Sequence, residues 1–253
     1  MCKRKNNDSQ YFTKEWKNHT RCFRHHRRYT KFTFQKLGMA TTTPKVISDK
    51  NEMRNWSRSM RAQGKLIGLV PTMGLLHMGH LSLVSQARSL CHVVAISIYF
   101  NPAQHAPSDD ISPYPSDLHA DLRKLAALPG GVDVVFHPRN LYDYGTDGGD
   151  VAAASCVDVD GSGHESWVTV EKLQAGLCAK SRPVFLRGAA TVVTKLFNIV
   201  EPDVAVFGKK DYQQWRVIQR MVTLFFRPFS SSTTILFQGE HLIFFFIFLI
   251  NYL

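Results

Sequence analysis

Two histidines three residues apart, His77 and His80, lie at the start of a predicted helix and soon after a short apolar run. The run, residues 66–70, stops at Pro71, and apolar residues then recur at helical spacing from Leu81, which predicts a strand that leads into a helix. The first backbone N–H groups of such a helix lack internal partners and carry the positive end of the helix dipole. Two imidazoles beside them can donate hydrogen bonds to phosphoryl oxygens. The pattern therefore predicts a nucleotide site.

Two further segments place polar residues directly after apolar runs. Residues 93–100 have the pattern of a buried strand that ends before Asn101-Pro-Ala-Gln104, because proline removes a backbone donor and fixes φ. A third apolar run, 204–207, precedes Gly208-Lys-Lys-Asp-Tyr-Gln-Gln214. Glutamine amides can hold carboxylate and hydroxyl groups, and Lys210 can neutralise phosphate charge. Each segment alone is also typical of an ordinary turn or a solvated surface, so the interpretation depends on their combination.

In combination the segments resemble a known superfamily. His77-x-Gly79-His80 is the signature of the nucleotidylyltransferases and class I aminoacyl-tRNA synthetases, and Pro71-Thr-Met-Gly74 before it is similar to the pantothenate synthetase (pantoate–β-alanine ligase) family. The later blocks match that family's Asn-Pro-x-Gln and Gly-x-Lys-Asp-Tyr-Gln-Gln, so the resemblance covers about residues 46–222. Lys209 and Trp215 are typical of plant members.

The resemblance implies an α/β fold with a Rossmann-like parallel sheet, and the alternation of strand and helix patterns agrees with it. Ligands are then expected at the carboxyl ends of the strands. One helical pattern predicts a core-facing stripe, made of Val192, Val193, Leu196, Phe197 and Val200.

The activity that the resemblance implies is a two-step ligation with ATP as substrate and Mg2+ as cofactor. Pantoate first forms an acyl adenylate and releases pyrophosphate, and β-alanine then displaces AMP to give pantothenate. His77, His80 and Lys210 are the expected catalytic residues, with His80 as proton donor. Gln104 and Gln214 are expected to bind pantoate, and Gln104 also β-alanine. The expected ATP-binding residues are Met73, Gly74, Leu75, Leu76, His77, Met78, Gly79, His80, Gly208, Lys209, Lys210 and Asp211.

Two details of this site are left open by the sequence. Met78 stands where many relatives carry an acidic residue between the histidines, and we interpret the change as an adjustment of the site rather than a loss of it. The ligands of Mg2+ are not identified, and Asp121 only aligns with an acidic patch.

Residues 1–38 form a basic leader with eleven Lys or Arg against two acidic residues, so they carry +9 of the formal charge of +11. The remaining chain carries only +2, which argues against a nucleic-acid surface on the predicted catalytic domain, residues 39–222. The leader itself is expected to be disordered, with organelle targeting or RNA binding as alternatives. The five cysteines lack metal-site spacing. Family members of this type are cytoplasmic homodimers, and we expect the same here.

Residues 223–253 depart from the family. The Met-Ser-Ser-Arg loop and the lid domain of its second half are expected to be missing, and a non-family hydrophobic tail takes their place. The apolar stretch 242–253 has 12 residues, shorter than the ~20 that span a bilayer, so no stable membrane span is expected. Two alternatives to ligation therefore stay open: a catalytically impaired fragment that only binds nucleotide, or another nucleotidylyltransferase.

Overall fold

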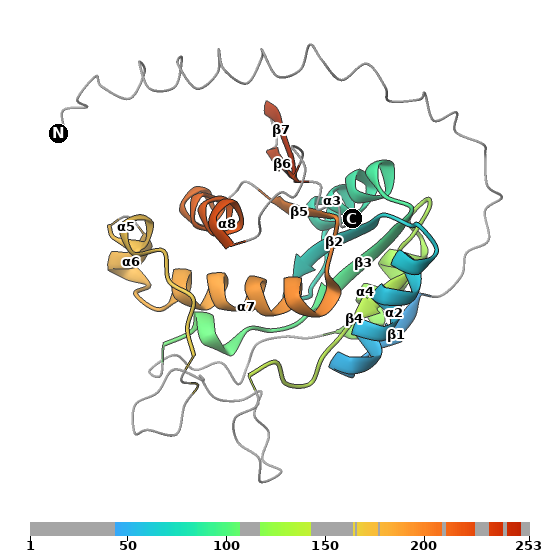
Figure 1. Cartoon of the computed structure of the whole chain (residues 1–253), viewed down its shortest axis with the longest axis horizontal. Coiled ribbons are helices and arrows are strands. Elements are labelled where there is room, and N and C mark those ends of the chain that lie inside the picture. The colour runs from blue at the N-terminus through green and yellow to red at the C-terminus, as the bar shows by residue number, and fades with distance from the viewer. Residues whose placement is uncertain are drawn as a thin grey trace, which may run out of the picture. The chain divides into compact units, whose positions relative to one another are not determined.

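One sheet organises the part of the chain that the structure describes (Figure 1). The computed structural model describes residues 44–106, 117–142, 164, 166–176, 178–208, 211–225, 233–239 and 242–248, so the leader 1–38 lies outside the described residues. The strand order is β1-β4-β3-β2-β5-β6-β7, and every pairing is parallel except that of β6 with β7. The strands are β1 (Lys45–Ile47), β2 (Ile67–Thr72), β3 (Val93–Ile98), β4 (Val134–Phe136), β5 (Val204–Gly208), β6 (Thr233–Gly239) and β7 (Leu242–Phe248). The predicted α/β fold with a parallel sheet is confirmed.

Helices cover both faces of this sheet, because successive side chains of a strand point to opposite sides. Ile67 and Leu69 of β2 belong to a core cluster with residues of α2, α7 and α8, whereas Val70 belongs to a second cluster with residues of α3 and α4. The helices are α2 (Lys50–Ala62), α3 (Met78–Leu90), α4 (Leu118–Ala126), α5 (Glu171–Gln174), α6 (Cys178–Ser181), α7 (Phe185–Val200) and α8 (Tyr212–Phe225), with a 3-10 helix η1 (Pro102–Gln104).

Helix α7 supplies much of the first cluster, and 12 of its 16 residues are buried. The predicted core-facing stripe from Val192 to Val200 is confirmed, since all five of its residues are buried. Full burial of such a Val, Leu or Phe side chain contributes about 1.5–3 kcal/mol. The helix ends at Val200, and the carbonyl of its C-cap residue, Glu201, accepts a hydrogen bond from Arg61 of α2. Asp203 then accepts from the backbone N of Ile67 at 2.7 Å, which ties the end of α7 to the start of β2.

The direction in which the chain adds strands to the sheet reverses at β2. From β2 the chain passes to β3 and then β4 on one side, whereas β5 pairs with β2 on the other side. In open parallel sheets a ligand binds at such a reversal, outside the carboxyl ends of the strands. β2 ends at Thr72 and β5 ends at Gly208, directly before the two segments that are predicted to bind ATP. The topology therefore brings these segments to the same edge of the sheet.

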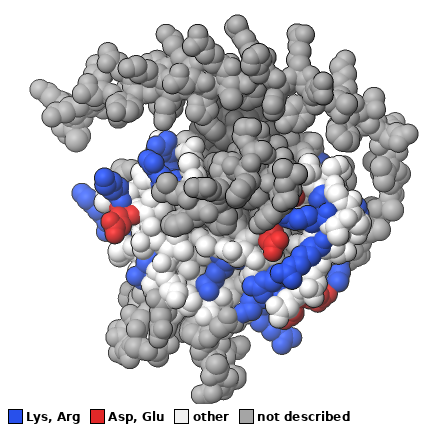
Figure 2. All heavy atoms as spheres, in the orientation of Figure 1, with Lys and Arg blue, Asp and Glu red and all other residues white. Residues whose placement is uncertain are grey.

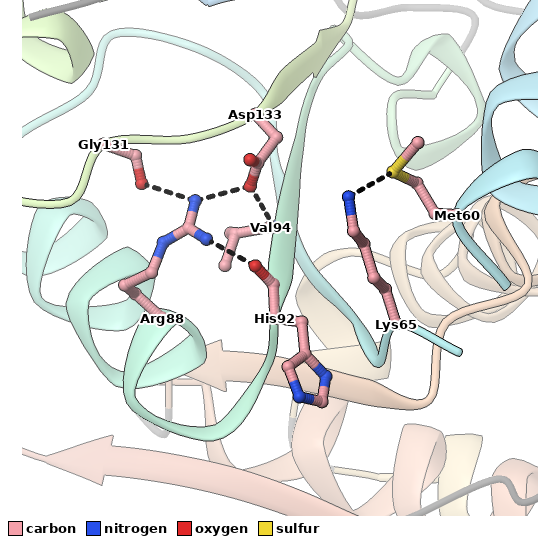
Figure 3. A network of polar contacts seen from close by, with 7 residues as sticks. All are labelled: Met60, Lys65, Arg88, His92, Val94, Gly131 and Asp133. Carbon is pink, nitrogen blue, oxygen red and sulfur yellow. Dashed lines mark hydrogen bonds and ion pairs between the residues drawn. The ribbon is translucent and has the colours of Figure 1, made fainter. Parts of the chain in front are cut away.

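A polar network fastens α3 at the opposite, amino edge of the sheet (Figure 3). The Arg88 guanidinium donates to the Asp133 carboxylate at 2.5 Å and to the carbonyls of His92 at 3.0 Å and Gly131 at 3.3 Å. Asp133 also accepts from the backbone N of Val94 at 2.7 Å. Because the last turn of α3 is held against β3 and β4 in this way, its first turn keeps a fixed place at the carboxyl edge.

The region after residue 222 continues the sheet in the structure. The predicted domain boundary falls inside α8, which runs to Phe225, and β6 pairs with β5 in the register Ala205↔Ile235. β7 then pairs antiparallel with β6. Within the described ranges, no helix has both the length and the apolar character that crossing a membrane requires.

Candidate active site at the carboxyl edge of the sheet

The loop between β2 and α3 has a backbone conformation that few sequences accept. Gly74 has φ +95°, a region that favours glycine, and Leu75 has φ +51° although it carries a side chain. A non-glycine residue in this conformation costs about 1–3 kcal/mol, so the surroundings must hold it in place. A Cβ at Gly74 would lie 3.3 Å from Ile98 and 3.5 Å from Asp121. The loop is thus folded tightly over β3 and α4.

Asp121 of α4 anchors this loop by hydrogen bonding. Its side chain is 1% exposed, and its Oδ1 accepts from the backbone N of Leu76 at 2.7 Å. Lys124, one turn later, lies 3.6 Å from the same oxygen and donates to the Leu76 carbonyl at 2.7 Å. Both backbone groups of Leu76 are therefore held by one helix. This function of Asp121 is not among the predictions from sequence, although a carboxylate between Leu118 and Leu125 on the apolar stripe of α4 is a signal that points to it.

His77 and His80 lie together at the start of α3, with ring centroids 4.1 Å apart. His77 is the N-cap, and its Nδ1 accepts from the backbone N of Gly79 at 3.0 Å. The Nδ1 of His80 accepts from the backbone N of His77 at 3.4 Å. Because both Nδ1 atoms accept, each neutral ring carries its hydrogen on Nε2. The arrangement presents two Nε2–H donors beside the N–H groups of the helix start.

Burial sets the charge of His80. Burial, followed by the neighbouring His77, lowers the pKa of His80 to about 4, while Asp121 opposes this change and Lys124 adds to it. At neutral pH the His80 ring is therefore an uncharged hydrogen-bond donor. Gly79 between the histidines is required by packing as well, because a Cβ there would lie 2.8 Å from the His77 ring. Met78 is 78% exposed, so its side chain extends into solvent.

The Gln104 segment follows β3, the neighbour of β2. Asn101 caps the short helix η1, and its Nδ2 donates to Gln104 Oε1 at 2.8 Å and to the Gly188 carbonyl at 3.2 Å. Gly188 lies in the first turn of α7, where a Cβ would come within 2.0 Å of the Ala103 carbonyl oxygen. Only glycine allows α7 and η1 to approach so closely. Gly188 is not among the site residues predicted from the sequence.

The third predicted segment follows β5 and leads into α8. Gly208 ends the strand and Asp211 directly precedes the helix, where its carbonyl accepts from the backbone N of Trp215 at 3.0 Å. Lys209 and Lys210, the predicted ATP-binding and catalytic lysines, lie outside the described residues. The two glutamines differ: Gln213 is buried and donates to the carbonyls of Leu173 and Gly176, whereas Gln214, the predicted pantoate residue, is half-buried.

The three segments therefore leave three neighbouring strands in the spatial order β3-β2-β5. A Cβ at Gly208 would lie 4.0 Å from Leu83 of α3, so the end of β5 is adjacent to the helix that carries the histidines.

An arrangement of helix N–H groups, imidazole donors and amides suits a ligand with phosphate and carboxylate groups. The basic side chains visible in Figure 2 lie mainly over the region of α2, where Lys50, Arg54 and Arg58 recur at helical spacing.

Comparison with known proteins points to one family. The family model "Pantoate-beta-alanine ligase" matches residues 45–233. The pantoate–β-alanine ligase of Lotus japonicus is 68% identical over 187 residues, which are 71% of this chain and 61% of that protein, and the Arabidopsis thaliana protein of the same name is 64% identical, covering 71% and 60%. The chain thus spans about three fifths of the length of these relatives.

Solved structures agree with the sequence comparison. The pantothenate synthetase of Thermus thermophilus is 36% identical with a TM-score of 0.56, covering 70% of this chain and 56% of its own. The pantoate–β-alanine ligase of Francisella tularensis, crystallised with β-γ ATP and β-alanine, is 33% identical with a TM-score of 0.58, covering 71% and 62%.

Proposed function

The chain belongs to the pantoate–β-alanine ligase family, and on this premise we propose that it joins pantoate and β-alanine to pantothenate with ATP. The observation that carries the proposal is the meeting of three segments at the carboxyl ends of β3, β2 and β5, beside the reversal of strand order. A nucleotide and a hydroxy acid would then bind next to each other. This proximity is what a reaction between a carboxylate and a phosphate requires.

In the first step, a pantoate carboxylate oxygen forms a bond to the α-phosphorus of ATP, and the bond to the pyrophosphate oxygen breaks. Negative charge accumulates on the phosphoryl oxygens, and preorganised donors stabilise it. The Nε2–H groups of His77 and His80 and the backbone N–H groups at the start of α3 fill this role. His80 acts as a neutral hydrogen-bond donor through its Nε2–H group. With a pKa of about 4, its ring is uncharged at neutral pH and carries no second ring proton to release.

In the second step, the β-alanine amine attacks the acyl carbon of pantoyl adenylate, an amide bond forms and AMP leaves. Gln104 and Gln214 bind pantoate in this scheme, and Gln104 also contacts β-alanine. The segments from Met73 to His80 and from Gly208 to Asp211 bind ATP, and Lys210 neutralises phosphate charge. The Francisella tularensis relative, crystallised with β-γ ATP and β-alanine, supports these ligands for a member of the family.

Mg2+ is proposed to enter with ATP rather than at a metal site of its own. Among the described residues, no group of three or more His, Cys, Asp and Glu side chains could hold a metal ion. Asp121, the buried carboxylate beside the loop, already accepts from Leu76 and faces Lys124. Mg2+ commonly keeps several waters and binds substrate phosphates through few protein ligands. Its chemistry here would be neutralisation of phosphate charge.

The experiment that tests the proposal is pantoate-dependent exchange of labelled pyrophosphate into ATP by the purified chain. Exchange reports the first step without the later amine attack. His80→Ala is expected to lower the exchange rate by about two to three orders of magnitude, as the loss of one transition-state donor does. His119→Ala, an exposed histidine on α4, serves as the matched control and should exchange at the parent rate.

A second candidate function is nucleotide binding without ligation, which the donors at the start of α3 would support by themselves. A folded protein that binds ATP but shows no exchange would support it. Exchange that depends on another acid, and not on pantoate, would instead indicate another nucleotidylyltransferase. The homodimer and the cytoplasmic location remain proposals from the family, and the molecular mass in solution tests the first.

A further inference from the structure

Tyr142, which no motif includes, is 3% exposed and lies in the loop after β4. Its hydroxyl donates to Asn101 Oδ1 at 2.7 Å across 41 residues of sequence. Its ring contacts His164 edge-on, with the ring centroids 4.8 Å apart, and Lys195, whose Nζ lies 5.2 Å from the centroid of the tyrosine ring. A buried tyrosine with these two contacts can aim its hydroxyl at a single acceptor.

The direction of the Asn101 amide follows from its backbone partners. The Asn101 side-chain atom 3.3 Å from the Ala103 backbone N accepts a hydrogen bond from it, so this atom must be the oxygen Oδ1. The side-chain atom 3.2 Å from the Gly188 carbonyl donates to it, so this second atom must be the nitrogen Nδ2. Asn101 itself is 1% exposed. With Tyr142 as second donor to Oδ1 and Gln104 as second acceptor of Nδ2, all four positions of the amide are used.

The amide of Gln104 is fixed as a consequence. Asn101 Nδ2 can only donate, so the Gln104 atom at 2.8 Å is Oε1. The other end of the Gln104 amide is the Nε2 group, which carries two hydrogens to donate. Gln104 is only half-buried, so this end is the part that can reach a ligand.

We propose that Tyr142 is a positioning residue of the pantoate site, which acts through Asn101 to turn the Nε2–H2 end of Gln104 toward the ligand. This inference rests on the proposed function for the identity of the ligand. It specifies the chemistry of recognition: Gln104 donates two hydrogen bonds, and its partner on pantoate is an acceptor, a carboxylate or hydroxyl oxygen. Buried polar chains of this kind fix one arrangement only when every member is satisfied.

The first test measures the affinity of the full chain for pantoate and, separately, for ATP. Tyr142→Phe removes one hydroxyl and one hydrogen bond, which is worth about 0.5–1.5 kcal/mol, so pantoate binding should weaken about 2- to 10-fold while ATP binding stays within twofold. Tyr99→Phe is the matched control, because that buried hydroxyl contacts the backbone N of Leu141 at 3.5 Å. Equal losses for both ligands in Tyr142→Phe, or no loss for pantoate, would overturn the proposal.

A second variant tests the direction of the Gln104 amide. In Gln104→Glu one carboxylate oxygen keeps the hydrogen bond from Asn101, and the outward donor becomes a charged acceptor. If Gln104 presents donors to pantoate, this variant should lose at least tenfold in pantoate affinity, because a hydrogen bond becomes a repulsion. Retained or improved affinity would mean that Gln104 presents its oxygen, contrary to the proposal.

NMR of the side-chain amides separates this inference from the proposed function. The Asn101 Nδ2 hydrogens should exchange slowly with water in the parent protein, and both the Asn101 and Gln104 amide signals should shift and exchange faster in Tyr142→Phe. These signals report the hydrogen-bond chain even if the parent protein does not bind pantoate, an outcome that would count against the proposed function alone. Unchanged signals in Tyr142→Phe would refute the chain.

Discussion

Replacing Asp121 by alanine should release the loop that carries the nucleotide site. Leu76 is 1% exposed, and its backbone N loses its acceptor at 2.7 Å. A buried unsatisfied N–H costs about 1–3 kcal/mol. The Lys124 side chain is 44% exposed and can be hydrated, so the loss of its ion pair adds at most about 1 kcal/mol. The free energy of unfolding should therefore fall by roughly 1–4 kcal/mol.

Asp121→Ala should lower the affinity for ATP by more than its loss of stability alone would. Leu75 is held at φ +51°, a conformation that costs about 1–3 kcal/mol and relaxes once its neighbour Leu76 is free. The relaxed loop no longer places the N–H groups at the start of α3 beside the phosphates. We expect ATP affinity to fall at least tenfold in Asp121→Ala. Asp121→Asn keeps an acceptor but loses the charge, which roughly halves the strength of the hydrogen bond. Its affinity for ATP should therefore lie between those of the parent and of Asp121→Ala.

Calorimetric ATP binding and denaturant unfolding measure the two effects. Asp117→Ala is the matched control, because Asp117 caps the same helix through the backbone N of Ala120 at 2.8 Å. Its loss should cost about 0.5–2 kcal/mol of stability without a change in ATP affinity. An Asp121→Ala variant that bound ATP within twofold of the parent, or an Asp117→Ala variant that lost as much ATP affinity, would contradict this function of Asp121.

Two further changes test other parts of the site. Because burial first and His77 second lower the pKa of His80 to about 4, the His80 ring signal should titrate near pH 4 in NMR. The unfolded ring takes up its proton near pH 6.5, so the stability contributed by His80 should be full above pH 6.5 and fall as the pH drops toward 4. A midpoint near pH 6.5 in the NMR titration of His80 would contradict the buried geometry. Gly188→Ala puts a Cβ 2.0 Å from the Ala103 carbonyl, so η1 must move, and pantoate affinity should fall at least tenfold with ATP affinity retained. A calorimetric pantoate affinity equal to that of the parent would show that α7 and η1 can separate at no cost.

The sequence could predict what is local in the chain. Apolar runs that stop at Pro71, at Asn101 and at Gly208 predict strands followed by polar loops, and the structure has a strand end at or near each of them. The parallel sheet and the buried stripe of α7 follow from the same periodicities. The roles of the residues in the three loops stay predictions, and Lys210 lies outside the described residues.

What the sequence could not predict is which distant side chain holds each loop. Asp121 lies 45 residues from Leu76, Tyr142 lies 41 from Asn101, and Gly188 lies 87 from the same asparagine. Such pairs are set by how helices pack on the sheet, and a single chain carries no periodic signal for them. The sequence also does not show that packing requires glycine at position 79, where the atom closest to an added Cβ belongs to the ring of His77.

Each of the three loops has an anchor of this kind. Asp121 holds the loop after β2, the chain from Tyr142 holds the loop after β3, and Gln213 ties the start of α8 to the backbone of Leu173 and Gly176. Loops that leave the carboxyl edge have no further ladder hydrogen bonds, so their polar backbone groups must find partners elsewhere. Because each anchor is buried and acts on one loop, its loss should impair the ligand of that loop more than the others. ATP affinity and pantoate affinity should therefore respond separately to changes at Asp121 and at Tyr142.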